Sequence, residues 1–472
     1  MRTHFLVALL CISTSTMFAA NTVKLHGKIT NPISDSILVR YSETWVGYEP
    51  KVVATRLSAD GSFSLSFPLE HKYTQVLIQH GDQETEIFPE PGNDLGITLD
   101  AKNFDSSLHY TGKGAEVANF LALHMITIGS SLTFGGQLQE LCIEDPAAFE
   151  EKANVALNKE IDFLKANDKV LPASFKKMWK ANYQYNLYYI MLSYPTFHEM
   201  QKQHSYTISS IPKEDYKTVL DVPAAFDDEL LTVSAYRMYL DAYYYQLITA
   251  KNAMAGSDVK ATDSAQDIEA YRNMPKGSAE IYGAGHICNK LKYYTYTEGQ
   301  ARVLAYKKQF PASPYLSLLD EKMALKKKFS AGSKAVDFTF TTLDGKAMKL
   351  SDLKGKVVYL DFWASWCGPC KGEMPFAKKV EEKYKDKDVV FLYVSIDADD
   401  AAWKSAMQKM QIDGVNTRDD GGGWDGAIAK QYDIRSIPAY FLIDKEGNYA
   451  ADNAPRPSST GDLTNTIDKL LR

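Results

Sequence analysis

Apolar and polar side chains alternate with a period of two over much of residues 21–112. The clearest runs are Val23–Ile29, Ser62–Phe67 and Val76–Gln79, and turns rich in glycine, proline, asparagine and aspartate separate them. Alternation between such turns is typical of antiparallel strands with one buried face. We therefore predict an N-terminal antiparallel β domain, either a small sandwich or a small barrel.

The pattern becomes helical over residues 113–330. Asp145-Pro146 is a capping residue followed by a first-turn proline, and it predicts a helix that continues to about Asn167. Four further helices are predicted over Pro172–Leu192, Pro223–Met254, Ser278–Phe310 and Ser313–Phe329. Short connections between long helices favour antiparallel helix pairs, so we expect a central all-α region.

Tyrosines are concentrated in three parts of this region, at 183–189, 236–245 and 293–296. Rigid rings with polar tips suit a binding surface. Such residues also serve as packing material between helices. The sequence leaves both interpretations open.

Strand and helix patterns alternate over residues 331–472. Apolar runs predict buried strands at Val357–Trp363, Val389–Ser395 and Ala439–Ile443. Amphipathic segments predict helices over Pro369–Tyr384, Ala401–Met410 and Gly461–Leu471. Strands that alternate with helices indicate an α/β sheet, so the last domain differs in class from the first two.

The first twenty residues have the pattern of a secretory signal peptide. A polar start precedes the apolar stretch Phe5–Ile12, and small residues follow up to Ala20. A lipoprotein signal with Cys11 as the lipidated residue is the alternative, but Leu10 is bulky where that processing prefers a small residue. Either signal implies export across the inner membrane to the periplasm or cell envelope, with a cleavage site that the sequence does not fix.

Composition narrows the class of protein. The 472 residues include 45% hydrophobic and 24% charged residues, which is the mix of a globular protein, and the length suggests about three domains. Lysine and arginine number 53 against 59 aspartates and glutamates, for a net charge of −6. A mildly acidic chain argues against nucleic acid as a partner. Beyond the N-terminus no apolar run is long enough to predict a transmembrane span.

Cysteine usage points to two separate roles. Removal of residues 1–20 leaves four of the five cysteines, too few for a domain held together by disulfides. Cys142 and Cys288 are far apart in sequence and are either two buried thiols or a structural disulfide. Cys367 and Cys370 form a C-x-x-C pair.

The strongest chemical feature is Trp366-Cys367-Gly368-Pro369-Cys370, which lies between a predicted strand and a predicted helix. A cysteine at a helix N-terminus is stabilised as a thiolate by the dipole and the free N–H groups. The second cysteine, about one turn later, can close a disulfide with the first. Pro369 suits an early helical position, where its missing N–H is not needed. Because the thiolate is the nucleophile in disulfide exchange, the motif predicts redox chemistry.

A structural zinc site is the alternative for a C-x-x-C pair, and it needs four ligands. No other cysteine follows residue 288, and all nine histidines lie between residues 4 and 286. The last domain therefore cannot complete a zinc site from these residue types. The same absence of histidine argues against a Cys–His protease or acyl transferase.

Ile437-Pro438 precedes the last predicted strand. Only X–Pro bonds adopt the cis form at modest cost. A cis proline here would turn the backbone of Ile437 outward, where an extended substrate segment could pair with it. The alternative is an ordinary turn proline, but its place some seventy residues after the C-x-x-C motif favours the functional interpretation.

The segments YLDFWASWCGPC and SIPAYFLID, together with the strand–helix order, resemble the thioredoxin superfamily. The resemblance is closest to the TlpA-like branch, which includes ResA-type reductases of cytochrome c maturation. Further marks of that branch are Phe338–Gly345, Leu350–Lys356 and Cys370–Pro375. The resemblance covers residues 331–472. The preceding β and helical segments resemble, less specifically, N-terminal extensions of envelope members.

The resemblance implies a role for individual residues. Cys367 would be the attacking thiol and Cys370 the resolving thiol. Asp361 matches the buried carboxylate that manages the proton on the second cysteine, and Glu373 matches an acidic residue that tunes the cysteines. Pro438 matches the cis proline that faces the disulfide.

Substrate contact is expected at the residues around the disulfide, namely Trp366, Gly368, Pro369, Ile437 and Pro438. One departure from the family pattern is Ala439, where threonine is common. This difference is expected to alter substrate contact and not to remove the chemistry.

The sequence therefore predicts a multidomain chain with a signal peptide (1–20), a β domain (21–112), a helical domain (113–330) and a thioredoxin-like redox domain (331–472). We expect a thiol–disulfide oxidoreductase of the envelope that reduces disulfide-containing proteins, in cytochrome c maturation or in envelope redox homeostasis. It would use no cofactor beyond the Cys367–Cys370 disulfide, and no metal or nucleic acid.

Electrons would come from a membrane thiol reductant. Two rivals stay open. One is a peroxide-reducing enzyme, although Trp366 and Ser365 do not match the Thr-x-x-Cys setting of a peroxidatic cysteine. The other is an envelope binding protein whose N-terminal domains capture a ligand.

Overall fold

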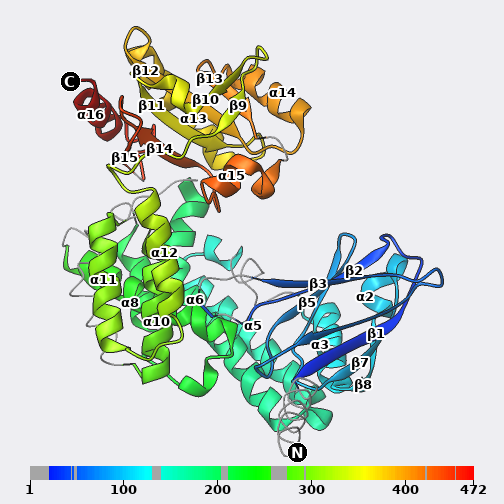
Figure 1. The fold of residues 1–472 in the computed structure, drawn as a ribbon. Helices are drawn as coiled ribbons and strands as arrows, with labels where there is room; N and C mark the ends of the chain where they lie inside the picture. The colour runs from blue at the N-terminus through cyan, green and yellow to red at the C-terminus, as the bar shows by residue number, and fades with distance from the viewer. Residues whose placement is uncertain are drawn as a thin grey trace, which may run out of the picture. The chain divides into compact units, whose positions relative to one another are not determined.

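The computed structural model describes residues 21–43, 45–46, 50–129, 140–203, 211–256, 274–291, 294–419, 422–451 and 453–472. The predicted signal peptide, residues 1–20, lies outside the described residues. The chain divides into two compact units, Met1–His286 and Ile287–Arg472. Each unit is described by itself below, with the element labels of Figure 1.

The N-terminal part of the first unit is built from two four-stranded sheets. One has the order β4-β1-β7-β8 and the other the order β3-β2-β5-β6. The strands are β1 (Thr22–Thr30), β2 (Ser36–Tyr41), β3 (Lys51–Arg56), β4 (Ser62–Pro68), β5 (Val76–His80), β6 (Gln83–Ile87), β7 (Asp94–Asp100) and β8 (His109–Lys113). A short helix, α2 (Phe104–Ser107), precedes β8.

Alternating residues of both sheets form one core, which makes this part a β sandwich. Val23 and Leu25 of β1 and Ile37 and Val39 of β2 are all fully or almost fully buried. Most strand pairs are antiparallel as predicted, but β1 and β7 pair in parallel. The two strands are far apart in the chain, so local alternation carries no information about the direction in which they pair.

The rest of the first unit is helical and includes α3 (Ala115–Thr127), α5 (Pro146–Asn167), α6 (Ala173–Gln203), α7 (Lys217–Leu220) and α8 (Ser234–Ala255). Helix α3 lies beside the strands (Figure 1). Asp145 caps α5 through the N–H of Ala148, as its Asp-Pro start predicted. The hydroxyl of Tyr73 hydrogen-bonds the hydroxyl of Ser174 at 2.6 Å and so links the sandwich to α6.

Three predicted helix boundaries in this part of the chain were wrong. Helix α6 continues beyond Leu192, through Pro195, to Gln203. Helix α8 begins at Ser234 and not at Pro223, because the preceding segment is held in a non-helical form by the hydroxyls of Tyr236 and Tyr239. The helix predicted over Ser278–Phe310 is two helices, α10 (Lys276–Lys290) and α11 (Tyr296–Gln309).

The tyrosines of α6 and α8 pack mainly against one another. Tyr185 meets Tyr236 and Tyr239 edge to face, with ring centroids 4.9 and 5.1 Å apart. Tyr236 and Tyr239 are fully buried. These contacts favour the packing interpretation for this part of the tyrosine-rich region.

The second unit contains α11, α12 (Leu316–Lys328) and an α/β domain. Its main sheet has the order β13-β12-β11-β14-β15, and β9 (Thr339–Thr341) pairs with β10 (Ala347–Lys349). The sheet strands are β11 (Val357–Trp363), β12 (Val389–Ser395), β13 (Val415–Arg418), β14 (Ala439–Ile443) and β15 (Tyr449–Ala451). The helices are α13 (Gly368–Tyr384), α14 (Asp400–Met410), α15 (Ala427–Gln431) and α16 (Thr460–Leu471).

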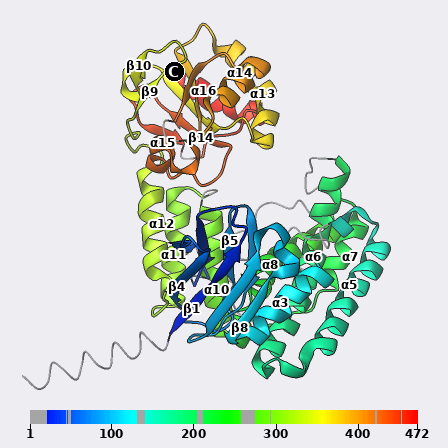
Figure 2. The same ribbon diagram turned by 90° about the vertical axis from the view of Figure 1, so that its right-hand side faces the viewer.

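Strand β11 is central, parallel to β12 and antiparallel to β14. All seven of its residues are buried, because helices and neighbouring strands cover it on every side. Figure 2 shows α13, α14 and α16 around the strands of this sheet. Helices α13 and α16 are joined where the hydroxyl of Tyr384 donates to Asp468 at 2.7 Å. The site described below lies where β11 ends and α13 begins.

The division at 112 and 330 that the sequence suggested stays a proposal. It is supported by the change from strands to helices after β8 and by the return of strands at β9. No helix in the described part of the chain is long and apolar enough to cross a bilayer.

Candidate active site

The two cysteines of the C-x-x-C motif form a disulfide at the start of α13. Cys367 is the N-cap residue, and its sulfur accepts the N–H of Cys370 at 3.1 Å. Cys367 is 5% exposed and Cys370 only 1%. The first cysteine therefore has the helix N-terminus and the better access, which are the two features that a nucleophilic thiol needs.

The turn that brings β11 to the cysteines is fixed by a carboxylate that the sequence did not single out. Asp397 accepts the backbone N–H of Ser365 at 2.8 Å and its hydroxyl at 2.6 Å. The same carboxylate accepts the hydroxyl of Ser395, the last residue of β12, at 2.6 Å. Asp397 is buried, so it locks the loop before Cys367 to the adjacent strand.

Exposed residues surround the disulfide on the N-terminal side of α13. Gly368 and Pro369, between the cysteines, are both exposed. Trp366 is 55% exposed, and its ring meets that of Trp424, which is 45% exposed. An exposed tryptophan pair beside a disulfide is an apolar surface on which a protein substrate could rest.

The Ile437–Pro438 peptide bond is cis. Its place follows from strand register, because Phe362 of β11 is paired with Ala439 of β14. Pro438 therefore lies beside Trp363, at the end of β11 from which the cysteine loop emerges. Ile437 and Pro438 are half-buried. The sequence-predicted substrate residues are thus gathered at one end of the sheet.

Asp361 is a buried carboxyl in the middle of the sheet. It is 1% exposed and is paired in register with Tyr393 of β12 and Tyr440 of β14. Burial raises the pKa of Asp361 well above its usual range, and the nearby carboxyls of Glu373 and Glu381 raise it further. A carboxylate whose pKa is raised is a stronger base than an ordinary one, so in its ionised form it is suited to accept the proton of a thiol.

Glu373, the second predicted acidic residue, is held by a loop far away in the sequence. Its carboxylate accepts the N–H of Ser458 at 2.8 Å and the hydroxyl of Ser458 at 3.0 Å. Arg456 lies 3.8 Å from the same carboxylate. The side chain is 8% exposed and projects from the buried face of α13, which also carries Cys370. Neither Ser458 nor Arg456 could be found from the sequence, because only the fold brings that loop to α13.

Cys142 and Cys288 do not form a disulfide; both are thiols. Burial raises the pKa of Cys142 to about 12 and that of Cys288 to about 11, which makes both poor nucleophiles. Among the described residues no group of three or more histidine, cysteine, aspartate or glutamate side chains is placed to hold a metal ion.

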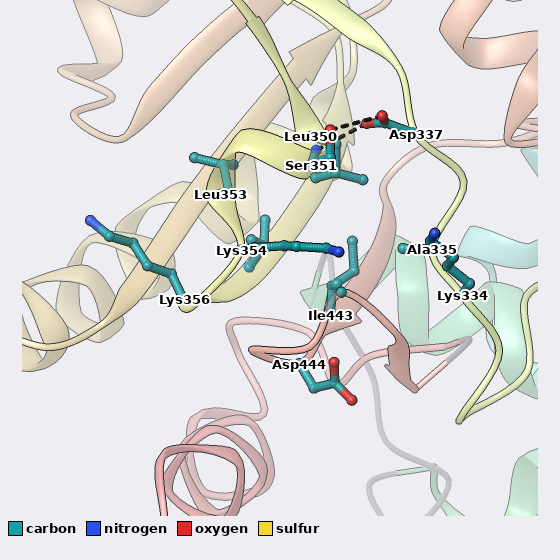
Figure 3. A pocket seen from close by; sticks show the side chains of 12 residues that line it. Lys334, Ala335, Asp337, Leu350, Ser351, Leu353, Lys354, Lys356, Ile443 and Asp444 are labelled. Atoms are coloured by element: carbon teal, nitrogen blue, oxygen red, sulfur yellow. Dashed lines mark hydrogen bonds between the residues drawn. The ribbon is translucent and has the colours of Figure 1, made fainter.

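A separate hollow of about 120 Å³ lies elsewhere in this domain (Figure 3). Lysines line part of it, and at one edge Asp337 accepts the N–H and the hydroxyl of Ser351 at 2.9 and 2.8 Å. None of the residues predicted for catalysis or substrate contact lines this hollow. The predicted site at the start of α13 and this hollow are therefore separate features of the domain.

Comparison with known proteins agrees with this geometry. The Redoxin family model matches residues 330–467. Thiol-disulfide oxidoreductase ResA of Bacillus thuringiensis subsp. konkukian is 38% identical over 120 residues, which are 25% of this chain and 67% of that protein. ResA of Bacillus subtilis is 34% identical over 122 residues, or 26% of this chain and 66% of that protein.

This chain belongs to the ResA-like branch of the thioredoxin superfamily. The family match lies in the C-terminal domain, where the sequence resemblance was found, and it makes the protein a thiol–disulfide oxidoreductase. That activity implies protein substrates, and oxidoreductases of this fold use redox-active cysteines. The roles of the individual residues stay predictions.

Two solved structures are similar to part of the chain. The thioredoxin domain of a thiol-disulfide oxidoreductase from Bacteroides vulgatus is 30% identical and covers 30% of this chain and 99% of that chain, with a TM-score of 0.27. A thiol-disulfide oxidoreductase from Bacteroides fragilis is 28% identical and covers 28% of this chain and 98% of that chain, with a TM-score of 0.26.

Proposed function

We propose that this protein is an exported reductase of protein disulfides in the periplasm or cell envelope. The observation that carries the proposal is the Cys367–Cys370 disulfide at the N-terminus of α13, with its first cysteine beside exposed Trp366. A dithiol on a rigid helix end that is bordered by exposed residues is suited to attack a disulfide in another protein. Export is supported by the signal-peptide pattern of residues 1–20.

In the proposed reaction the reduced protein attacks with the thiolate of Cys367. The bond between the two substrate sulfurs breaks, a mixed disulfide forms, and one substrate thiolate leaves and takes up a proton. Cys370 then loses its proton to Asp361 and attacks the sulfur of Cys367, which releases the second substrate thiolate. The protein ends as the disulfide, having supplied two electrons.

Each turnover leaves Cys367 and Cys370 oxidised, so the reaction needs a reductant. We propose that a membrane thiol reductant supplies electrons from the cytoplasm and docks on the surface around Trp366 and Pro438. Substrates would be apocytochrome c, as in ResA-type cytochrome c maturation, or misoxidised envelope proteins in redox homeostasis. Glu373, Gly368, Pro369 and Ile437 would tune the cysteines or contact these partners.

The test is reduction of insulin by the purified protein with dithiothreitol as electron donor. We expect turnover by the wild-type protein, none by Cys367→Ser, and a stalled mixed disulfide with Cys370→Ser. The stalled complex, isolated from an envelope extract and identified by mass spectrometry, would name the natural partner. A Cys367→Ser variant that reduces insulin as fast as the wild type would refute the proposal.

A further inference from the structure

The buried carboxyl of Asp361 must gain and lose a proton in the proposed reaction. Yet it is 1% exposed, and its Oδ1 atom has no hydrogen-bond partner among the described residues. A group so placed needs a neighbouring titratable group that does reach solvent. The inference that follows rests on the proposed function, because only turnover makes this proton move.

The register of the strands indicates which residue first receives a proton from Asp361. Tyr393 is its partner on β12, so the two side chains project from the same face of the sheet. Tyr393 is 1% exposed, and its side chain lies close enough to the carboxylate of Glu381 on α13 to act on the pKa of that carboxyl. A buried hydroxyl thus lies between the strand that carries Asp361 and the carboxyl on the helix.

Gly414 shows that this contact is built into the domain. A methyl group at this position would lie 2.7 Å from Cε2 of Tyr393, 2.8 Å from Oε1 of Glu381 and 2.7 Å from the carbonyl oxygen of Phe391. These distances are shorter than any side chain tolerates. The glycine therefore leaves the room that the tyrosine and the glutamate occupy together.

Glu381 is half-buried and borders a surface hollow of about 300 Å³ that Lys378 and Asp413 also line. Burial and the charge of Asp413 raise the pKa of Glu381 to about 7, against the opposing effects of Tyr393 and Lys378. A carboxyl that titrates near neutral pH is suited to take up and release protons under working conditions.

We propose that Glu381 is a proton-transfer residue that connects Asp361 to solvent through the hydroxyl of Tyr393. After Cys370 has given its proton to Asp361, the carboxyl of Asp361 passes a proton to Tyr393 while Tyr393 gives its own to Glu381. Glu381 releases that proton to water in the hollow. Oxidised protein that is being re-reduced uses the path in reverse. No electrons move along it, so the redox balance of the two cysteines is unchanged.

The charged and titratable groups around this path come from several elements. The carboxyls of Glu373 and Glu381 on α13 raise the pKa of Asp361. The charge of Asp361 in turn raises the pKa of Tyr359 on β11 and of Tyr440 on β14. Arg456 is near Glu373 and acts on Tyr440. Glu381 itself faces Tyr393, Lys378 and Asp413. Apart from Lys378 and Arg456 these groups are acidic, so they favour the protonated forms of Asp361 and Glu381.

The test is steady-state reduction of insulin with dithiothreitol as electron donor, measured from pH 5.5 to 9, because every further turnover requires Asp361 to release its proton again. Glu381→Gln keeps an acceptor for Tyr393 but cannot titrate, and Tyr393→Phe keeps the ring without the hydroxyl. We expect each variant to be about tenfold slower than the wild type near pH 7. Each should also lose the change of rate with pH that the wild type shows around neutral pH. Glu382→Gln is the matched control, because Glu382 is exposed on the same helix and pairs with Lys385.

Imidazole, a small proton carrier, should restore the rate of Glu381→Gln in a concentration-dependent manner and leave Glu382→Gln unaffected. If the wild-type protein does not reduce insulin at all, the proposed function fails. Two results with an active wild type would exclude Glu381 from a proton path. In the first, folded Glu381→Gln has the same pH profile as the wild type. In the second, it is slowed equally at every pH and imidazole does not restore its rate. Tyr393→Phe decides the matter in the same way should Glu381→Gln fail to fold.

Discussion

The ring of Trp366 meets the ring of Trp424 edge to face, with centroids 5.8 Å apart and an interplanar angle of 65°. Trp424 is held there by its own loop, since Gly423 donates to the carbonyl of Ile396 at 2.7 Å. Asp419, which precedes Trp424, accepts the N–H of Ala429 at 2.8 Å near the start of α15. The loop thus presents an exposed tryptophan beside the cysteine motif, although exposing such a ring to water is unfavourable.

Trp424→Ala should therefore weaken the reduction of protein disulfides. Aromatic anchors at interfaces commonly contribute about 1–2 kcal/mol, so kcat/KM for insulin is expected to fall by roughly 5- to 30-fold. Reduction of the small disulfide 5,5′-dithiobis(2-nitrobenzoate) should not change, because it needs no extended surface. Leu343→Ala is the control, since Leu343 is 54% exposed in the same domain but is not part of the tryptophan pair. Equal loss on both substrates would show that Trp424 does not act through protein docking.

Cys367 should have a thiol pKa below its ordinary value of about 8.5. Its N-cap position on α13 places the developing thiolate at the positive end of the helix, and the N–H of Cys370 points at its sulfur. Alkylation of the reduced protein by iodoacetamide, measured against pH, should show Cys367 reacting first with a depressed pKa. The buried thiol of Cys142 is an internal control that should react slowly. A faster reaction at Cys370 would reverse the assignment of attacking and resolving thiols.

Asp361→Asn should slow the reduction of insulin by about tenfold or more, because the amide cannot accept the proton of Cys370. The same change should stabilise the oxidised protein. The pKa of Asp361 is higher in the folded than in the unfolded protein, so the fold is stabilised when this carboxyl is neutral. That stabilisation is fully present below the unfolded pKa of about 3.9 and is lost as the pH rises through the folded pKa. The gain from asparagine should therefore grow with pH, to roughly 2 kcal/mol at pH 8.

Urea unfolding of the oxidised protein at pH 5 and pH 8, followed by tryptophan fluorescence, measures this gain. Asp388→Asn is the control, because Asp388 is exposed and should leave stability and rate unchanged. A less stable Asp361→Asn variant with full activity would remove the assigned role.

Predictions from the sequence succeeded where local chemistry decides the structure. Strands β11, β12 and β14 were found because they are short apolar runs, and α5 because Asp145 and Pro146 mark its start. The break between α10 and α11 was missed although a signal exists: Thr295 and Glu298 form a capping box. The late start of α8 carries no local signal of that kind, since it depends on hydrogen bonds that only the folded chain provides.

The same distinction applies to the site. The cysteines, Asp361 and the Ile437–Pro438 bond could be located because motif and spacing mark them. Asp397, Tyr393, Glu381 and Trp424 could not, because their proximity to those residues depends on strand register and on loops that meet only after folding. A lone glutamate on an amphipathic helix has the same appearance in sequence whether it faces solvent or a buried tyrosine.

The direction of electron flow is the last prediction. Oxidants of this superfamily stabilise the thiolate so strongly that their potentials are near about −120 mV, and a histidine between the cysteines commonly helps. Here Gly368 and Pro369 separate the cysteines, and residues 331–472 contain no histidine. The acidic groups around the site, Asp361 and Glu373, do not favour a second negative charge. We therefore expect a reduction potential below about −200 mV, nearer to the value of about −270 mV for thioredoxin.

Equilibration of the purified protein with glutathione redox buffers, followed by alkylation and mass spectrometry, gives the potential. Pro369→His is the matched variant, because it places an imidazole between the cysteines without touching the core, and it should move the potential upward by tens of millivolts. A protein this reducing cannot stay reduced in an oxidising compartment unaided, so a low value supports the need for a membrane reductant. A wild-type value above about −150 mV would instead make the protein an oxidant of thiols, and no electron supply from the cytoplasm would then be required.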